Sequence, residues 1–564
     1  MIPPSGQRAR QLLNRRTAVV LALAALGVLV ASADDYGLTY DEPVYMSRAM
    51  RAAQWLGLLW QAPGEAIRPE AITRLWDATG DEQPGLMKLI AGPTMLLSAP
   101  VLPPLAAMRT ATMLLSALLV GVLYAFVAGV WRRTEAVFAA AGLLLLPRVF
   151  AHCHLLAQDA PVMAWSFMAV AATYQYARKL GSELPSDARP YLTERPGFWL
   201  AAMGLAFGAA VATKVNGLFV PAIAIPWLAV YRRRAVLPAL GAMVVLGSAV
   251  FFGSWPWLWV DSVERLARYF AFFGQHYAVQ VTYFGEVYAR APWHYPLVMT
   301  AITTPPMVLA LAVAGLCSRG QADGEAGADW SQSLGGLRSA ALALMAWAVI
   351  VHIVPGSLPD SPKYNGVRLF LPVFPPLMVL AAAGFGLLAR AAVRPLASSL
   401  EEERPRVMAL MVLALLPLLA VTARTHPYCL SYYNAFIGGP SGAVARGMEA
   451  TYWGETYAAA LPWLNQHAPE GAQVWINVPG FVSSMALYQG FGKLRSGLEL
   501  TGGREALGQA DLCVVVNKPT EWGPEARGLV RAGGALYTEE LGGAPLTWVF
   551  PGPHWGQQTE GVRP

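Results

Sequence analysis

Apolar runs, each long enough to cross a membrane as a helix, recur along this chain and leave little room for any other architecture. A crossing helix needs about 20 mostly apolar residues. Eleven such runs are visible, and they begin near Thr17, Thr110, Ala136, Leu155, Phe198, Gly217, Ala235, Pro296, Ser339, Leu369 and Val407. Only 13% of the residues are charged, against roughly 25% in a soluble globular protein. The sequence therefore predicts a mainly α, polytopic membrane protein with about 11 transmembrane helices.

Basic residues indicate which apolar runs cross, because lysine and arginine are enriched in cytoplasmic loops. The run Leu86–Ala107 carries Lys88 and four prolines. If it crossed, every later arginine-rich loop would move to the outer face, so we expect it to lie on that face without crossing. The N-terminus is then cytoplasmic. The first run ends in Ala31-Ser32-Ala33 and resembles a cleavable signal peptide, but we favour an uncleaved first helix.

This topology places three regions outside the cytoplasm: Asp34–Arg109, Gly253–Tyr295 and a tail from about Thr425 to Pro564. The tail has strand-like runs at Gln473–Val478 and Leu512–Asn517, which alternate with helical patterns. Alternation of this kind predicts a small α/β domain. We therefore divide the chain into a transmembrane domain at residues 1–424 and an extracytoplasmic α/β domain at residues 425–564.

The cysteines and the net charge exclude several classes of site. The four cysteines form no CxxC pair and no Cys/His cluster, so zinc-finger and thioredoxin-like interpretations fail. Cys429 and Cys513 would pair only if both lie outside the cytoplasm, and we expect unpaired thiols. The net charge is +6, and its arginines lie at the predicted membrane edges. They therefore indicate topology, and we expect no nucleic-acid partner.

Charged groups beside a membrane span are costly, which makes them candidates for function. The predicted outer face gathers them from distant segments, and they are Asp41, Glu42, Lys88, Arg148, His152, His154, Asp159, Lys214, Lys363 and Arg368. Such a mixture suits the expulsion of a phosphate leaving group, because fixed cations stabilise the charge that develops on it. A carboxylate within reach of the attacking hydroxyl takes its proton.

Roles follow from residue type. Asp41 is the candidate base, and Glu42 beside it is an orienting partner or alternate base. The candidate binders of the donor phosphate are Lys88, Lys214, Lys363 and Arg368, and arginine is suited to bidentate contact with phosphate. Plainer interpretations are a solvated helix boundary for the Asp-Glu pair and a snorkelling side chain for Lys88. His152, His154 and Asp159 could ligate a metal, but structural hydrogen bonding is favoured and no metal site is predicted.

Several short segments resemble motifs of the GT-C membrane glycosyltransferases, in particular the protein O-mannosyltransferase and aminoarabinose-transferase superfamily (glycosyltransferase family 39-like). The segments are Tyr40–Tyr45, Gln83–Ile90, His154–Pro161, Thr213–Gly217 and Arg368–Pro375, with tail segments His426–Tyr428, Ser431–Asn434 and Tyr452–Gly454. Gln83 stands where the family motif has histidine. The resemblance implies an eleven-span catalytic domain at 1–424, a polyprenyl-phosphate-sugar donor and inversion at the sugar. It also implies Asp41 as base and Asp159 as a second catalytic carboxylate.

Other functions stay open at this point. An O-antigen ligase or polymerase would place its key residues in a large late outer loop, whereas the densest acidic motif here follows the first span. A transporter or flippase for a lipid-linked sugar would favour internal repeats and charges near the bilayer midplane. We expect a bacterial inner-membrane enzyme whose acceptor is a protein, lipid or envelope glycan. A divalent cation, Mg²⁺ or Mn²⁺, remains a possible cofactor.

Overall fold

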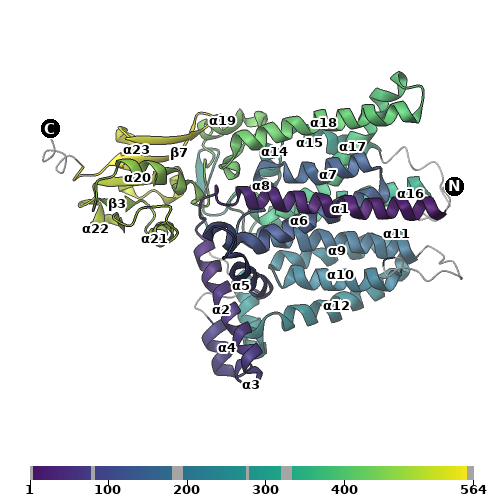
Figure 1. The fold of residues 1–564 in the computed structure, drawn as a ribbon, viewed down its shortest axis with the longest axis horizontal. Coiled ribbons are helices and arrows are strands. Elements are labelled where there is room, and N and C mark those ends of the chain that lie inside the picture. The colour runs from purple at the N-terminus through teal and green to yellow at the C-terminus, as the bar shows by residue number, and fades with distance from the viewer. Residues whose placement is uncertain are drawn as a thin grey trace.

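A computed structural model describes residues 4–77, 83–180, 193, 195–274, 278–318 and 333–555. Its long helices lie side by side, with the N-terminus at one end of the bundle and a small sheet domain at the other (Figure 1). The helices that connect the first two long helices, α2 to α5, also lie at the sheet-domain end. Asp81 and Glu82, which precede the segment Gln83–Ile90, lie outside the described residues.

The bundle contains a helix for each of the eleven predicted apolar runs. They are α1 (Pro4–Ser32), α6 (Pro104–Val130), α7 (Arg133–Leu144), α9 (Asp159–Leu180), α10 (Pro196–Val211), α11 (Phe219–Tyr231), α12 (Val236–Gly253), α14 (Tyr295–Thr303) with α15 (Pro306–Cys317), α16 (Leu334–Ile353), α17 (Phe374–Val393) and α18 (Leu400–Thr425). Within the described residues, six helices are long and apolar enough to cross a membrane, or seven if the pair α14–α15, bent by 111°, is one span. The predicted count of eleven is therefore not confirmed, although the mainly helical membrane architecture is.

The number of sufficiently long helices is smaller than the number of predicted spans because several of the helices are short. Helix α7 has 12 residues and α11 has 13, whereas a straight crossing of about 30 Å needs roughly 20 at 1.5 Å per residue. Apolar residues of separate short elements, the helix α8 (Pro147–His152) after α7 and the 3-10 turn Val215–Leu218 before α11, complete these runs in the sequence. Hydropathy counts such residues together with the helix, so it detects the run without detecting where the helix ends.

The arginine-rich turns meet the N-terminal end of the bundle. Arg133 donates from Nε to Asn14 Oδ1 over 2.8 Å, and Arg15 donates to Thr193 Oγ1 over 2.9 Å. Another arginine of the same turn, Arg132, pairs with a glutamate of α18. These contacts place the basic turns on one end, as the topology requires. Which side of a membrane this end faces stays a prediction.

Helix α5 (Leu86–Ser98), from the ambiguous apolar run, packs against α2 (Glu42–Gln61) at the opposite end. The two helices approach closely at Gly92, where a Cβ atom would stand 2.2 Å from the carbonyl oxygen of Ala49. Helix α5 has only 13 residues, too few to cross. Helices α3 (Pro63–Ala66), α4 (Pro69–Trp76) and α13 (Ser262–Gly274) and the hairpin of β1 (Val281–Tyr283) and β2 (Glu286–Tyr288) complete this end.

The tail contains a mixed five-stranded sheet in the order β4-β3-β5-β7-β6. The strands are β3 (Gln473–Ile476), β4 (Glu499–Gly502), β5 (Leu512–Val516), β6 (Tyr537–Leu541) and β7 (Ala544–Pro551), and the helices around them are α20 (Leu461–His467), α21 (Val482–Gly490), α22 (Arg504–Leu507) and α23 (Pro524–Ala532). Strand β3 runs parallel to β4 and β5, while β7 runs antiparallel to β5 and β6. Every residue of the central strand β5 is buried. The predicted α/β character of the tail is confirmed, and all four cysteines are free thiols.

Candidate active site

Arg368 connects two aspartates that arise from separate parts of the chain. Its Nη2 lies 2.7 Å from Asp41 Oδ2, and its Nε lies 2.9 Å from Asp159 Oδ2. The arginine is the first residue of the 3-10 turn η7 (Arg368–Val373), which leads directly into α17. Since a guanidinium is a planar fork of donors, one side chain holds both carboxylates in a fixed relation.

Asp159 is the buried member of the pair. It opens helix α9 and its side chain is 1% exposed. Lys214 donates from Nζ to Asp159 Oδ1 over 2.5 Å, so both oxygens of this carboxylate accept from cations. Lys214 directly precedes the turn η2 (Val215–Leu218), and Asn216 in that turn donates to the carbonyl of Leu369. Asp159 therefore fixes the positions of two cations.

Asp41 is the accessible member. It stands at the N-cap of α2 and its side chain is 38% exposed. Its Oδ2 accepts from Arg368 and also from the indole Nε1 of Trp453, over 3.1 Å. Within the described part of the chain, the structure gives its other oxygen, Oδ1, no hydrogen bond. One oxygen of Asp41 is therefore fixed by two donors and the other is available to a reactant.

Trp453 belongs to the tail and was not predicted as a site residue. It is 1% exposed, and its ring lies 4.0 Å from the guanidinium carbon of Arg368. The sequence gives one signal for it, since Tyr452-Trp453-Gly454 is an aromatic-glycine segment that lies just before the sheet domain. That signal does not say which group the tryptophan contacts.

Glu42, predicted as an orienting partner or alternate base, lies inside the bundle among partners that hold the fold together. It is fully buried and forms a bidentate ion pair with Arg109, with both N–O distances at 2.8 Å. The backbone amides of Thr39 and Leu156 also donate to it. Both of its oxygens are thus occupied, and Glu42 joins α2 to α6 and to the segment before α9 without facing a reactant.

Lys88 lies at the edge of the site. It is 6% exposed and donates to the carbonyl of Gln83 over 2.8 Å. The Gln83 side chain accepts from Gln158, the neighbour of Asp159, and donates to the Tyr45 hydroxyl. Tyr45 is in turn within electrostatic reach of Asp41, Asp159 and Arg368. Lys88 is therefore linked to the central group (Asp41, Asp159, Lys214 and Arg368) through Gln83 and the two residues that the Gln83 side chain contacts.

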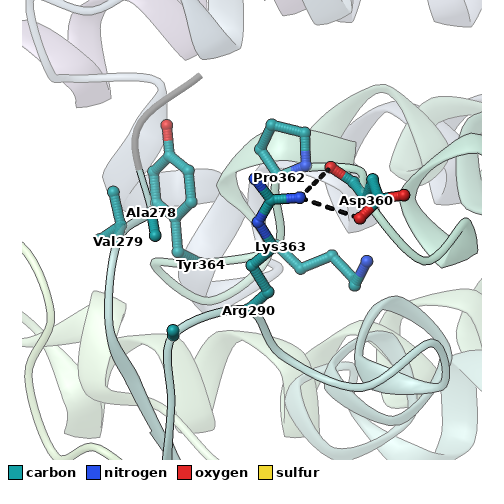
Figure 2. Close-up of a pocket in the computed structure, with 8 residues that line it drawn as sticks. Ala278, Val279, Arg290, Asp360, Pro362, Lys363 and Tyr364 are labelled. Atoms are coloured by element: carbon teal, nitrogen blue, oxygen red, sulfur yellow. Dashed lines mark hydrogen bonds and ion pairs between the residues drawn. The ribbon is translucent and has the colours of Figure 1, made fainter. Parts of the chain in front are cut away.

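Lys363 is placed away from the central group. Its ammonium donates to the carbonyls of Leu358, Pro359 and Ser361. Figure 2 shows Lys363 in the same pocket as the ion pair of Arg290 with Asp360. That pocket has a volume of about 10 Å³, barely one water molecule. Because its three donors are used locally, the structure does not support Lys363 as a phosphate binder.

The two histidines form hydrogen bonds, as favoured above. His154 contacts Ser32 Oγ through Nε2 and the Phe150 carbonyl through Nδ1, and His152 lies 3.4 Å from the Tyr452 hydroxyl. Within the residues that the structure describes, no group of three or more His, Cys, Asp and Glu side chains is arranged to hold a metal ion.

Comparison with known proteins gives one family match. Residues 100–283, about a third of the chain, match the family described as dolichyl-phosphate-mannose-protein mannosyltransferase. This region contains Arg109, Asp159 and Lys214. The resemblance inferred from the motifs is thus confirmed over this part of the chain. No curated protein matches the sequence.

Solved structures show a weaker likeness over most of the chain. ArnT from Cupriavidus metallidurans in the apo state is 17% identical, with a TM-score of 0.48, and the match covers 94% of this chain and 97% of the other. The same protein bound to undecaprenyl phosphate is 16% identical, with a TM-score of 0.45 and the same coverage. The archaeal oligosaccharyltransferase AglB from Archaeoglobus fulgidus is 12% identical, with a TM-score of 0.44, covering 89% of this chain and 69% of the other.

Proposed function

We propose that this protein is a membrane glycosyltransferase, which moves a sugar from a polyprenyl-phosphate carrier to an acceptor hydroxyl at the outer face of the membrane. The observation that carries the proposal is the accessible carboxylate of Asp41 beside the cations Arg368 and Lys214. A base and an anion-binding group in contact are what transfer from a lipid-linked sugar phosphate requires. The family match at residues 100–283 supports the donor class, since its description names a dolichyl-phosphate-linked sugar.

The proposed reaction is a single displacement at the anomeric carbon. The acceptor oxygen attacks that carbon while Asp41 Oδ1 takes the hydroxyl proton. The bond between the carbon and the phosphate oxygen breaks, and its electron pair leaves with the polyprenyl phosphate. Configuration at the sugar is inverted, because attack occurs opposite the leaving group. The cations stabilise the charge on the departing phosphate oxygen.

Asp159 has a positioning role in this proposal and does not act as a second base. Both of its oxygens accept from cations and its side chain is 1% exposed, so no oxygen faces the acceptor. By holding Lys214 and Arg368 it prepares the phosphate site before the donor arrives. Preorganised charge of this kind avoids reorganisation during the reaction.

The donor is proposed to be a monophosphate, because the description of the matched family names a dolichyl-phosphate-linked sugar. A sugar joined to a polyprenyl monophosphate is a phosphodiester with a single negative charge, whereas a diphosphate donor carries two.

A divalent cation does not fit this donor set. Mg²⁺ prefers six oxygen ligands, and the carboxylate oxygens of Asp159 and one of Asp41 already accept from nitrogen donors. Only Asp41 Oδ1 remains among these four oxygens. We therefore propose that cations of the protein stabilise the leaving group and that the reaction uses no metal ion.

The site is proposed to face the periplasm of a bacterial inner membrane. It lies at the end of the bundle opposite the arginine-rich turns, which the positive-inside rule assigns to the cytoplasm. The sheet domain of the tail lies at the same end as the site (Figure 1). Donor, acceptor and tail would then all meet outside the cytoplasm.

The test uses purified full-length protein in proteoliposomes with labelled hexose and pentose polyprenyl monophosphates. We expect the wild type to transfer sugar to an acceptor hydroxyl and Asp41→Asn to lose at least about 100-fold in rate, as expected for removal of a general base. Asp360→Asn is the matched control, because Asp360 lies in an outer loop with its side chain 93% exposed. Full activity of Asp41→Asn would reject the assigned base. Movement of the lipid-linked sugar across the bilayer without transfer would reject the enzyme and indicate a flippase.

A further inference from the structure

Trp453 is the one contact to the Asp41–Arg368 pair that the tail supplies among the described residues. Its indole N–H donates to Asp41 Oδ2 over 3.1 Å, and its ring covers the Arg368 guanidinium at 4.0 Å. We propose that Trp453 is a positioning residue of the transfer reaction, which fixes the rotamer of the base and the orientation of the phosphate-binding arginine. This inference rests on the proposed function.

The indole N–H determines which oxygen of the base is free. Arg368 Nη2 and Trp453 Nε1 both reach Oδ2 of Asp41. Two donors from different directions oppose rotation of the carboxylate about its Cβ–Cγ bond. Oδ1 of this side chain, which is 38% exposed, then keeps one direction toward an acceptor hydroxyl. Without the indole N–H, a single donor would hold the carboxylate, and its two oxygens could exchange places.

The indole ring determines how Arg368 meets the donor. Nε and Nη2 of the guanidinium are engaged by Asp159 and Asp41, and one face lies against the Trp453 ring. Within the described residues the structure gives Nη1 no hydrogen bond. Nη1 can therefore donate to a phosphate oxygen. The cation–π contact with the ring holds the guanidinium plane in this orientation.

The tail is built to hold Trp453 at this position. The carbonyl oxygen of Trp453 accepts from the backbone amide of Tyr40, the residue before the base, over 2.9 Å. Gly454 follows at a φ of +87°, and a Cβ there would stand 2.8 Å from the Tyr40 ring. Only a glycine allows this close approach without strain.

The sheet domain anchors the other side of the same segment. Tyr457 donates to Asn477 Oδ1 over 2.6 Å, and Thr547 on β7 donates to the carbonyl of Thr456 over 2.8 Å. Trp453 is therefore fixed between the base motif and the sheet. The tail contributes to the site through this residue, and does not serve only as a separate binding domain.

The test compares a substitution that removes the N–H but keeps an aromatic ring with one that removes the ring as well. In Trp453→Phe the aromatic face remains, and we expect kcat to fall about tenfold to 100-fold, as for loss of a hydrogen bond to a charged group. The KM for the lipid-linked donor should change by less than about twofold, because Arg368 keeps its aromatic neighbour. Trp453→Leu should in addition weaken binding of undecaprenyl phosphate to the purified protein.

Trp463→Phe is the matched control, because Trp463 lies on α20 of the same domain and stacks on His467. It should leave kcat and KM unchanged. Rates are divided by the amount of folded protein from size-exclusion chromatography. If Trp453→Phe does not fold, replacement by benzothienylalanine, which keeps the bicyclic shape and lacks the N–H, takes its place.

The outcomes separate this inference from the proposed function. A wild type that transfers sugar, together with normal kcat in Trp453→Phe, would overturn the positioning role alone. A lower yield of folded Trp453→Phe with normal kcat per folded molecule would also overturn it, since that result describes a structural residue. A wild type that transfers no sugar from any polyprenyl monophosphate would overturn the proposed function and this inference with it.

Discussion

Asp41 and Arg368 lie 327 residues apart in the chain, yet the carboxylate of one and the guanidinium of the other are 2.7 Å apart. The contact joins the N-cap of α2 to the turn that leads into α17. In the proposed reaction it also joins the proton acceptor to the cation that receives the leaving phosphate. Displacing either partner would therefore affect both halves of the reaction.

Arg368→Lys should lower kcat/KM by at least about 100-fold, because an ammonium lacks the planar fork that reaches Asp41 and Asp159 together. It should also lower the melting temperature, since the buried Asp159 loses one of its two cationic partners. Both quantities can be measured on detergent-solubilised protein. Arg290→Lys is the control, because its ion pair with Asp360 is exposed and such pairs contribute about 0–1 kcal/mol. Wild-type activity in Arg368→Lys would contradict the proposed site.

Glu42→Gln should destabilise the fold by about 3–5 kcal/mol, because it leaves the buried Arg109 without its counterion. The two side chains are both fully buried and share two hydrogen bonds. Thermal unfolding monitored by fluorescence measures the effect. The neighbouring substitution Asp41→Asn is the comparison, and its effect on unfolding should be much smaller, since Asp41 is 38% exposed. Equal stability of Glu42→Gln and wild type would show that the ion pair does not support the fold.

Lys363→Met should leave the affinity for undecaprenyl phosphate within about twofold of wild type, because the three donors of this ammonium are used by local carbonyls. Lys214→Met provides the contrast. It removes a cation from Asp159 and should weaken binding by about tenfold or more. A titration of each purified variant with undecaprenyl phosphate measures the two affinities. A large loss in Lys363→Met with normal affinity in Lys214→Met would reverse the assignment of the two lysines.

The stability of the tail should depend on pH through Glu449. Burial raises the pKa of this carboxyl from 4.5 to about 7. Between pH 4.5 and about pH 7, the folded protein therefore keeps a proton on Glu449 that the unfolded chain has released. The stability contributed by the neutral carboxyl is complete below about pH 4.5 and is lost as the pH rises through about 7.

The melting temperature should consequently be lower at pH 8 than at pH 6. Burial also raises the pKa of Glu455 to about 7, so both groups contribute in the same direction. Glu449→Gln should reduce the difference between the two pH values, because glutamine does not titrate. Glu499→Gln, at an exposed position of β4, is the control. A pH difference that Glu449→Gln leaves intact would exclude Glu449 as its source.

Sugar transfer should persist in excess EDTA. Three of the four carboxylate oxygens of Asp41 and Asp159 accept from nitrogen donors, and the cations supply the charge that a metal would otherwise provide. The assay is the transfer rate before and after chelation, with Mg²⁺ and Mn²⁺ added back. Loss of transfer on chelation and its recovery with either ion would show that a metal takes part.

The sequence was sufficient for those site residues that mark helix ends on one side of the bundle. Asp41, Asp159, Lys214 and Arg368 each stand within a residue of the start of a helix or turn. Assigning those ends to the same face brings the four residues to one region. Hydropathy and arginine counting provide that assignment without any knowledge of side-chain packing.

Other roles depended on packing that the sequence does not show. Glu42 is adjacent to Asp41 and has the same chemistry, but the first turn of α2 directs it toward Arg109 inside the bundle. Lys363 has the right charge, but its loop folds around its own ammonium. Trp453 required a tertiary contact between the tail and the segment that links α1 to α2. An arginine at position 109 near a span was the one available signal for the partner of Glu42.

The chain order of the Asp41–Arg368 contact has a consequence for biosynthesis. A ribosome releases Asp41 first, and Asp159 and Lys214 follow before Arg368 has been translated. Arg368 arrives later, and its insertion brings the first aspartate to its cation. Until then the nascent chain carries Asp41 without the arginine that pairs with it. Maturation of this centre is therefore a late event in translation, whatever the rate at which the earlier helices insert.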